Sequence, residues 1–297
     1  MFGRHRARLR HTTLAAVAAV SLTGALVAAT EGAAAAAPTA APAAVSATTA
    51  TTIPTTCSGL TNRIVDGQLS RYVYRGQKFT RYPIGALSFG GTVETPQAFA
   101  LAQETSSQDV YFAVRTNGSL WKVTYNGTLT ATQVAASGWA GIRHLAASPT
   151  GTRLYALTTS GGLYRYSISS TGALRGLGAI ATTGWSGIGF ISPTAPDSTF
   201  DSFVGVNKSS GALVQYLVNR STGATTGKVL KASGWAGMKH VTVGACTGAQ
   251  ANSAPVIGFL DNGDAYGYFD PNAYDLNGSD LRAVGKIGSG FSGLLVD

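Results

Sequence analysis

The chain has 297 residues, of which 44% are hydrophobic and only 12% are charged. Its formal net charge at pH 7 is +9, and beyond the first ten residues its lysines and arginines stand singly rather than in runs. Nucleic-acid sites and polybasic lipid sites need clustered basic residues, so the composition excludes both classes of partner. We interpret the positive charge as a contribution to surface solubility.

The first 37 residues have the order of a secretory signal. Four arginines within residues 4–10 precede an uncharged apolar run over 12–29, and a string of alanines follows at 33–37. This order of segments predicts a cleavable signal peptide over residues 1–37. A membrane anchor is the alternative, because the apolar run is close to spanning length. The many small residues favour export, so we expect a secreted protein with no membrane span after cleavage.

Residues 38–56 are dominated by alanine, proline, threonine and serine, with no charged or aromatic residue. Such a stretch has little to bury and cannot offset its ordering entropy, so it predicts a flexible linker. The folded domain is therefore expected over residues 57–297. Removal of the signal leaves 18 basic against 12 acidic residues, a net charge of +6.

A glycine–aromatic pair recurs along the folded part. The aromatic members are Trp139, Trp185, Trp235 and Phe291, at spacings of 46, 50 and 56 residues. That period is typical of a four-stranded propeller blade. Five segments share a glycine followed by alternating apolar and polar positions, each after a short apolar strand, as in a hairpin. They are residues 67–72, 117–123, 161–166, 211–216 and 263–268.

The repeats fall out of phase with the ends of the folded part. The last glycine–aromatic segment, residues 290–297, has no hairpin after it, and the first hairpin has no such segment before it. Together they complete one unit, which predicts an all-β, five-bladed β-propeller closed by pairing of its N- and C-terminal strands. Closure removes the exposed sheet edges of an open array. The second unit departs from the pattern, because it has an insertion and only Ala86-Leu87 near the expected aromatic position.

The two cysteines, Cys57 and Cys246, lie in neighbouring units at the point of closure. In an exported protein such a pair favours a disulfide over two reactive thiols. Two thiols alone do not complete a four-coordinate zinc site, so we expect no metal here. We predict a Cys57–Cys246 bond that locks the seam of the ring.

One unit, residues 138–166, resembles the repeat of the tachylectin-like five-bladed propeller lectins. The resemblance rests on the Gly-Trp pair at 138–139, Pro-x-Gly at 149–151, Leu-Tyr-Ala-Leu at 154–157 and Leu-Tyr-Arg at 163–165. It is partial in the units that begin at Gly184 and Gly234. The family binds N-acetylated sugars in shallow sites between neighbouring blades, so the resemblance implies a lectin that binds glycans or cell-surface polysaccharide.

The resemblance assigns candidate ligand-binding residues. Aromatic faces cover the apolar side of a sugar ring, while nearby polar groups bond its hydroxyls. The candidates are Trp139, Trp185, Trp235 and Phe291, with Arg143 and Lys239 as polar partners. The alternative is that the recurring aromatic residues pack one blade against the next. His144 and His240 occupy a position that elsewhere holds Phe or Val, which indicates a buried strand position.

No catalytic residue or cofactor is expected. The sequence has no G-x-S-x-G, H-E-x-x-H or phosphate-loop motif, and neither histidine has the partners of a metal triad or a nucleophilic relay. Two alternatives to a lectin remain open. One is a propeller scaffold for protein–protein contact, and the other is an exported glycan-active hydrolase, which needs carboxylates that converge at the central channel.

Overall fold

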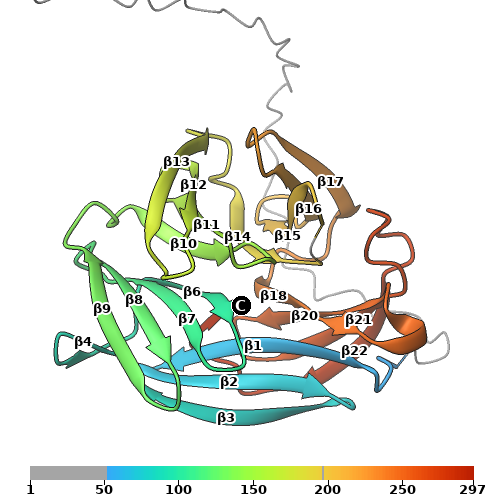
Figure 1. The fold of residues 1–297 in the computed structure, drawn as a ribbon. Coiled ribbons are helices and arrows are strands. Elements are labelled where there is room, and N and C mark those ends of the chain that lie inside the picture. Colours follow the sequence, from blue (N-terminus) through green and yellow to red (C-terminus); the bar gives the residue numbers. More distant parts are fainter. Residues whose placement is uncertain (1–51, 196) are drawn as a thin grey trace, which may run out of the picture. The chain divides into compact units, whose positions relative to one another are not determined.

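A computed structural model describes residues 52–195 and 197–297. They form five antiparallel sheets arranged in a circle around a central axis, and the C-terminal residue Asp297 lies near this axis (Figure 1). The signal peptide and most of the linker predicted from the sequence lie outside the described residues. Within those residues, no helix has the length and apolarity needed to cross a membrane.

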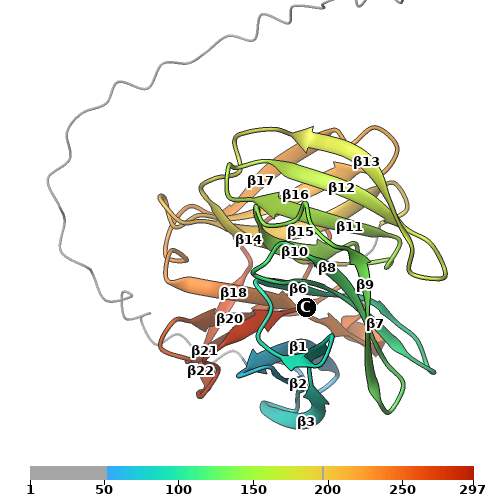
Figure 2. The ribbon, with the colours of Figure 1, turned by 90° about the vertical axis from the view of Figure 1, so that its left-hand side faces the viewer.

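Each sheet is one blade, and its strands follow one another outward from the axis (Figure 2). Blade I contains β1 (Cys57–Val65), β2 (Gln68–Arg75) and β3 (Lys78–Ala86). Blade II contains β6 (Ala98–Glu104), β7 (Asp109–Val114), β8 (Leu120–Tyr125) and β9 (Leu129–Ala135). Blade III contains β10 (Ile142–Ala147), β11 (Arg153–Thr158), β12 (Leu163–Ile168) and β13 (Leu174–Ala181).

Blades IV and V repeat the same order. Blade IV contains β14 (Ile188–Pro193), β15 (Phe200–Asn207), β16 (Leu213–Asn219) and β17 (Thr225–Lys231). Blade V contains β18 (Met238–Val243), β20 (Ala254–Leu260), β21 (Ala265–Asp270) and β22 (Arg282–Gly288). The short elements outside this pattern are β4 (Ser88–Phe89), β5 (Thr92–Val93), β19 (Ala245–Cys246), the 3-10 turn η1 (Gly248–Gln250) and β23 (Leu294–Val296).

The prediction of a closed five-bladed ring is confirmed. β23 pairs antiparallel with β1, and its register joins Asn62 to Val296, Arg63 to Leu295 and Ile64 to Leu294. The C-terminal strand is thus the innermost strand of blade I, where it also contacts β6 and β18. The insertion expected in the second unit is the β4–β5 hairpin.

The predicted disulfide is confirmed as well. Cys57 and Cys246 are bonded, and they face each other where β19 pairs with β1. Both cysteines are buried in a hydrophobic cluster between blades V and I. Ile53, which precedes the predicted domain start, packs into the same cluster and is also buried.

The hydrophobic core consists of five clusters, one between each pair of neighbouring blades. Alternation along the strands supplies both faces of a blade, because successive side chains point to opposite sides of a sheet. On β7, Tyr111 and Ala113 pack toward blade I, whereas Val110, Phe112 and Val114 pack toward blade III. Each blade is therefore buried on both faces by its neighbours.

The innermost strands β6, β10, β14, β18 and β23 surround the axis, and each contacts the next. Small side chains let them converge. β6 carries Ala98, Ala100 and Ala102, and β10 ends with Ala146 and Ala147, all buried. The C-terminal ends of all five inner strands line one cavity, so these ends meet on the same face of the ring.

Candidate functional site

The recurring glycine–aromatic pairs form identical turns between blades. The backbone N–H of each aromatic residue donates to the carbonyl of a hairpin glycine in the preceding blade, at 2.9 to 3.1 Å. These glycines have φ between 69° and 84°, a left-handed conformation that other residues adopt only with strain. At Gly161 a Cβ would also lie 2.8 Å from the nitrogen of Ser186. The pairs are Trp139 with Gly118, Trp185 with Gly161, Trp235 with Gly211 and Phe291 with Gly263.

Each aromatic ring packs against a tyrosine of the blade that it starts. The ring centroids of Trp185 and Tyr216 are 4.6 Å apart, and those of Trp235 and Tyr268 are 4.4 Å apart. Equivalent pairs join Trp139 to Tyr166 at 4.8 Å and Phe291 to Tyr72 at 5.2 Å. All four tyrosines are partly buried and pack against the hydrophobic clusters, and burial raises the pKa of Tyr216 to about 12.

The second blade uses the same turn without the aromatic pair. Leu87 takes the aromatic position, since its N–H donates to the carbonyl of Gly67 at 2.8 Å. Val123 stands where the other blades have tyrosine, and both residues belong to the cluster between blades I and II. Blade II thus has aliphatic side chains at both positions where the other blades have an aromatic pair, as expected for residues that pack against each other.

Packing accounts for the recurrence of the aromatic residues. Trp185, Trp235 and Phe291 are 8%, 4% and 3% exposed, so most of each ring lies in the core. Trp139 is only partly buried and keeps some accessible surface. A sugar-binding role for these four residues stays a prediction.

Arg143 and Lys239 join one blade to the next. The guanidinium of Arg143 donates to the carbonyls of Trp185 at 2.8 Å and Gly189 at 2.9 Å. The ammonium of Lys239 donates to the carbonyl of Phe291 at 2.6 Å. Burial lowers the pKa of both side chains. Lys208 and Gln97 make the corresponding contacts at two other junctions, so this donor is a regular part of the ring, and its binding role likewise stays a prediction.

The two histidines lie on inner strands. His144 on β10 has its Nε2 2.8 Å from the carbonyl oxygen of Ile191 on β14. His240 on β18 is buried, and its Nε2 lies 3.0 Å from a carboxylate oxygen of Asp297. Removal from water lowers the pKa of His144 to about 4, and the neighbouring His240 and Arg143 act in the same direction. His144 is therefore neutral at physiological pH.

A groove that the sequence did not predict lies between blades I and II. It has a volume of about 330 Å³ and is lined by Arg71 and Val73 of β2, Tyr82, Pro83 and Ile84 of β3, and Tyr125 of β8. Arg71 and Tyr82 are cross-strand partners, so their side chains share one face of the sheet. Tyr82 is 51% exposed. The groove thus combines two tyrosines with one cationic group.

The guanidinium of Arg71 is held firmly in this groove. It pairs with Glu104 at 3.0 Å and with the buried Asp109 at 2.9 Å, and it donates to the hydroxyl of Tyr111 at 3.1 Å. Burial raises the pKa of Tyr111, which keeps that hydroxyl protonated. Charged hydrogen bonds of this kind fix the plane of an arginine. Arg71 of blade I is therefore anchored to blade II beside the groove.

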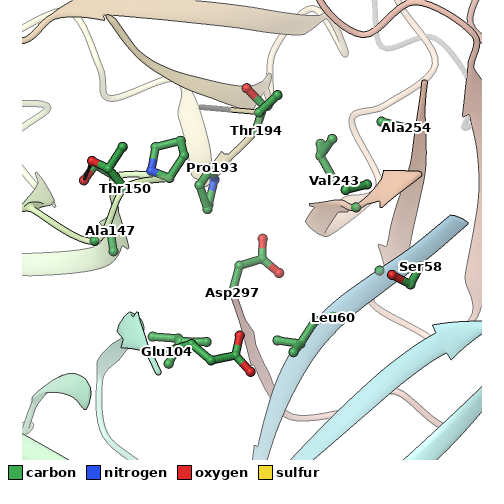
Figure 3. A pocket seen from close by; sticks show the side chains of 18 of the residues that line it. Ser58, Leu60, Glu104, Ala147, Thr150, Pro193, Thr194, Val243, Ala254 and Asp297 are labelled. Carbon is green, nitrogen blue, oxygen red and sulfur yellow. Dashed lines mark hydrogen bonds between the residues drawn. The ribbon is translucent and has the colours of Figure 1, made fainter. Parts of the chain in front are cut away.

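A second, larger cavity of about 870 Å³ opens on the axis, where the inner strands end (Figure 3). Strand direction places it on the face opposite to the glycine–aromatic turns. Asp297 stands in its middle and Glu104 at its side (Figure 3). These are the two carboxylates among its lining residues, which include no lysine, arginine or histidine. Across the described residues, no group of three or more His, Cys, Asp or Glu side chains is placed to hold a metal ion.

Comparison with known proteins adds little beyond the architecture. No family model matches the sequence, and no curated protein matches it either. Three similar solved structures are the six-bladed fucose-binding lectin of Aleuria aurantia, a triple mutant of AofleA from Arthrobotrys oligospora, and the periplasmic gluconolactonase of Pseudomonas aeruginosa.

The similarity of these three structures is distant. The lectin has 14% identity and a TM-score of 0.44, over 70% of this chain and 69% of its own. The AofleA mutant has 9% identity and a TM-score of 0.49, over 80% of this chain and 72% of its own. The gluconolactonase has 12% identity and a TM-score of 0.40, over 77% of this chain and 82% of its own. Scores this low carry no functional argument, and the blade count rests on strand pairing. Membership of the tachylectin-like family is not shown.

The packing of the aromatic pair at a blade junction can be tested in the fifth blade, by giving it the leucine and valine that the second blade has at these positions. The single change Trp235→Leu or Tyr268→Val should lower the free energy of unfolding by about 2–4 kcal/mol, since each leaves a cavity in the core. The double variant copies the Leu87 and Val123 pair. We expect its loss to be smaller than the sum of the single losses, by about 0.5–1.5 kcal/mol. Urea unfolding of the four proteins measures this coupling, and strictly additive losses would contradict it.

The position of His144 predicts a pH dependence of stability. Its pKa falls from 6.5 to about 4 on folding, so below pH 6.5 the unfolded chain binds a proton that the folded chain does not. Stability from this group is complete above pH 6.5 and declines as the pH falls toward 4, by as much as about 2–3 kcal/mol. His144→Gln keeps a donor for Ile191 and should flatten this decline in thermal melts. An equally steep decline in the variant would show that another group causes it.

Proposed function

We propose that the protein is a secreted, non-catalytic propeller that binds carbohydrate in the groove between blades I and II. The supporting observation is the half-exposed ring of Tyr82 beside Tyr125 and the fixed guanidinium of Arg71. An aromatic face covers the C–H side of a pyranose, and a rigid polar group orients its hydroxyls. A volume of about 330 Å³ suits a single sugar residue at the end of a chain.

The groove suits a neutral or N-acetylated sugar on a glycan or cell-surface polysaccharide. Arg71 already carries two carboxylate partners and its Nε is buried, so it presents no free positive charge and has one Nη1 N–H left to donate. The site lies between blades, as the resemblance to propeller lectins implies, but away from the glycine–aromatic turns.

The two alternative functions have weaker support. A protein–protein scaffold would present a contiguous apolar patch. The large exposed hydrophobic side chains are instead spread around the ring, at Tyr82, Val93, Val134, Leu177, Val229 and Tyr274. A hydrolase of the type considered above would need several carboxylates at the channel, and the axial cavity has Glu104 and Asp297.

Sugar titrations of matched tyrosine variants test this proposal. Tyr82→Ala and Tyr125→Ala should each weaken binding of an N-acetylhexosamine or fucose ligand by about tenfold or more, because a stacking face is lost. Tyr82→Phe keeps that face and should bind within about threefold of the unaltered protein. Val229→Ala, which shortens a similarly exposed apolar side chain that lines neither the groove nor the axial cavity, is the control.

Calorimetry or ligand-observed NMR gives the dissociation constants, after a glycan array has selected the sugar. The proposal fails if no glycan binds at millimolar concentration. It also fails if binding is present but unchanged in Tyr82→Ala and Tyr125→Ala.

A further inference from the structure

The axial cavity differs in chemistry from the groove. It is lined by residues of all five blades, mostly small or hydroxyl-bearing, and about 870 Å³ is large enough for an oligosaccharide of two or three residues. Hydroxyl groups stand around its wall. They come from Ser58, Ser148, Thr150, Thr194 and Ser253.

The charge in this cavity is opposite to that of the chain. The folded part has an excess of basic residues, yet the lining contains two carboxylates and no cationic side chain. Glu104 shares its one partner, Arg71, with Asp109. The side-chain carboxylate of Asp297 lies 3.0 Å from the imidazole of His240 and accepts a hydrogen bond from the hydroxyl of Thr242. The three acidic side chains of Glu104, Asp109 and Asp297 thus outnumber the single arginine that pairs with two of them.

Asp297 is also incompletely satisfied. One of its carboxylate oxygens accepts from Thr242 and lies beside His240, while the second oxygen, Oδ2, is buried without a hydrogen-bond partner. Leaving a carboxylate oxygen buried and unpaired costs free energy. Asp297 stands in the middle of the open space (Figure 3), so a cation bound there would lie close to its negative charge without reaching the buried Oδ2.

We propose that the axial cavity is a second binding site, specific for polyhydroxylated ligands that carry a free amine. Sugars whose amino groups are not acetylated, such as short glucosamine oligomers, have this chemistry. The ammonium group lies toward Asp297 and Glu104, and the sugar hydroxyls bond to the accessible hydroxyls of the wall, those of Ser58 and Thr150. Tyr274, 53% exposed at the rim, covers one face of an outer sugar residue. This inference does not rest on the groove between blades I and II.

The experiment compares a glucosamine trimer with its fully N-acetylated form on the unaltered protein. The two ligands share a skeleton and differ in charge. By calorimetry at low ionic strength we expect the amine form to bind the cavity at least tenfold more tightly. The preference should shrink in added salt and vanish at a pH that neutralises the sugar amine.

Two variants locate the binding. Asp297→Asn keeps the shape of the side chain and should abolish the preference for the amine. Thr150→Trp places a large side chain at an exposed turn of the cavity wall and should weaken binding of the amine trimer by about tenfold. Because Thr150 lies outside the pairing of β1 with β23, this variant tests the site even if Asp297→Asn fails to fold. Tyr82→Ala is the matched control and should leave amine binding unchanged.

Equal affinity for the two trimers, no binding of the amine trimer, or amine binding unaffected by Thr150→Trp would each overturn the inference. Loss of amine binding in Tyr82→Ala would overturn it too, because the ligand would then occupy the groove. Failure of the groove proposal has a different signature, namely neutral-sugar binding that does not depend on Tyr82 and Tyr125.

Discussion

Three residue pairs between β1 and β23 hold the two ends of the folded chain together, and the ring depends on them. A blade is buried on both faces only if its two neighbours are in place, so an open ring would expose two core faces and two sheet edges. The Cys57–Cys246 bond and the pairing of β19 with β1 reinforce the same seam from blade V. The axial cavity also depends on closure, because Asp297 reaches its centre only when β23 is seated.

The blade junctions repeat one solution with different side chains. A hairpin glycine accepts a hydrogen bond from the aromatic or leucine residue of the next turn, and a ring or aliphatic pair fills the space beneath. At four of the five junctions a long polar side chain also donates to carbonyls of that next segment. Because these contacts serve packing, the residues that recur most visibly are those least available to a ligand. The surfaces that differ from blade to blade, around Tyr82 and Asp297, are the ones to which we assign ligand binding.

This division explains what the sequence predicts and what it does not. The period of the glycine–aromatic pairs, the hairpin glycines and the unmatched end segments determine the blade count and the closure, and they place Cys57 beside Cys246. The groove could not be found in this way, because Tyr82 has no counterpart in the other outer strands and its neighbour Tyr125 comes from a different blade. The axial cavity is hidden for a similar reason, since its lining comes from short segments of all five blades.

Hydrogen exchange of the backbone amides of β23 tests ring closure most directly, in the protein with its disulfide intact and after reduction. If the seam is part of one cooperative unit, the amides of β23 that pair with β1 exchange only through global unfolding, at the same free energy as those of β10 and β11. Reduction then lowers that shared value for all of them together. Exchange of β23 amides at a free energy several kcal/mol lower, with β10 and β11 still protected, would show that the ring is stable open and contradict the account.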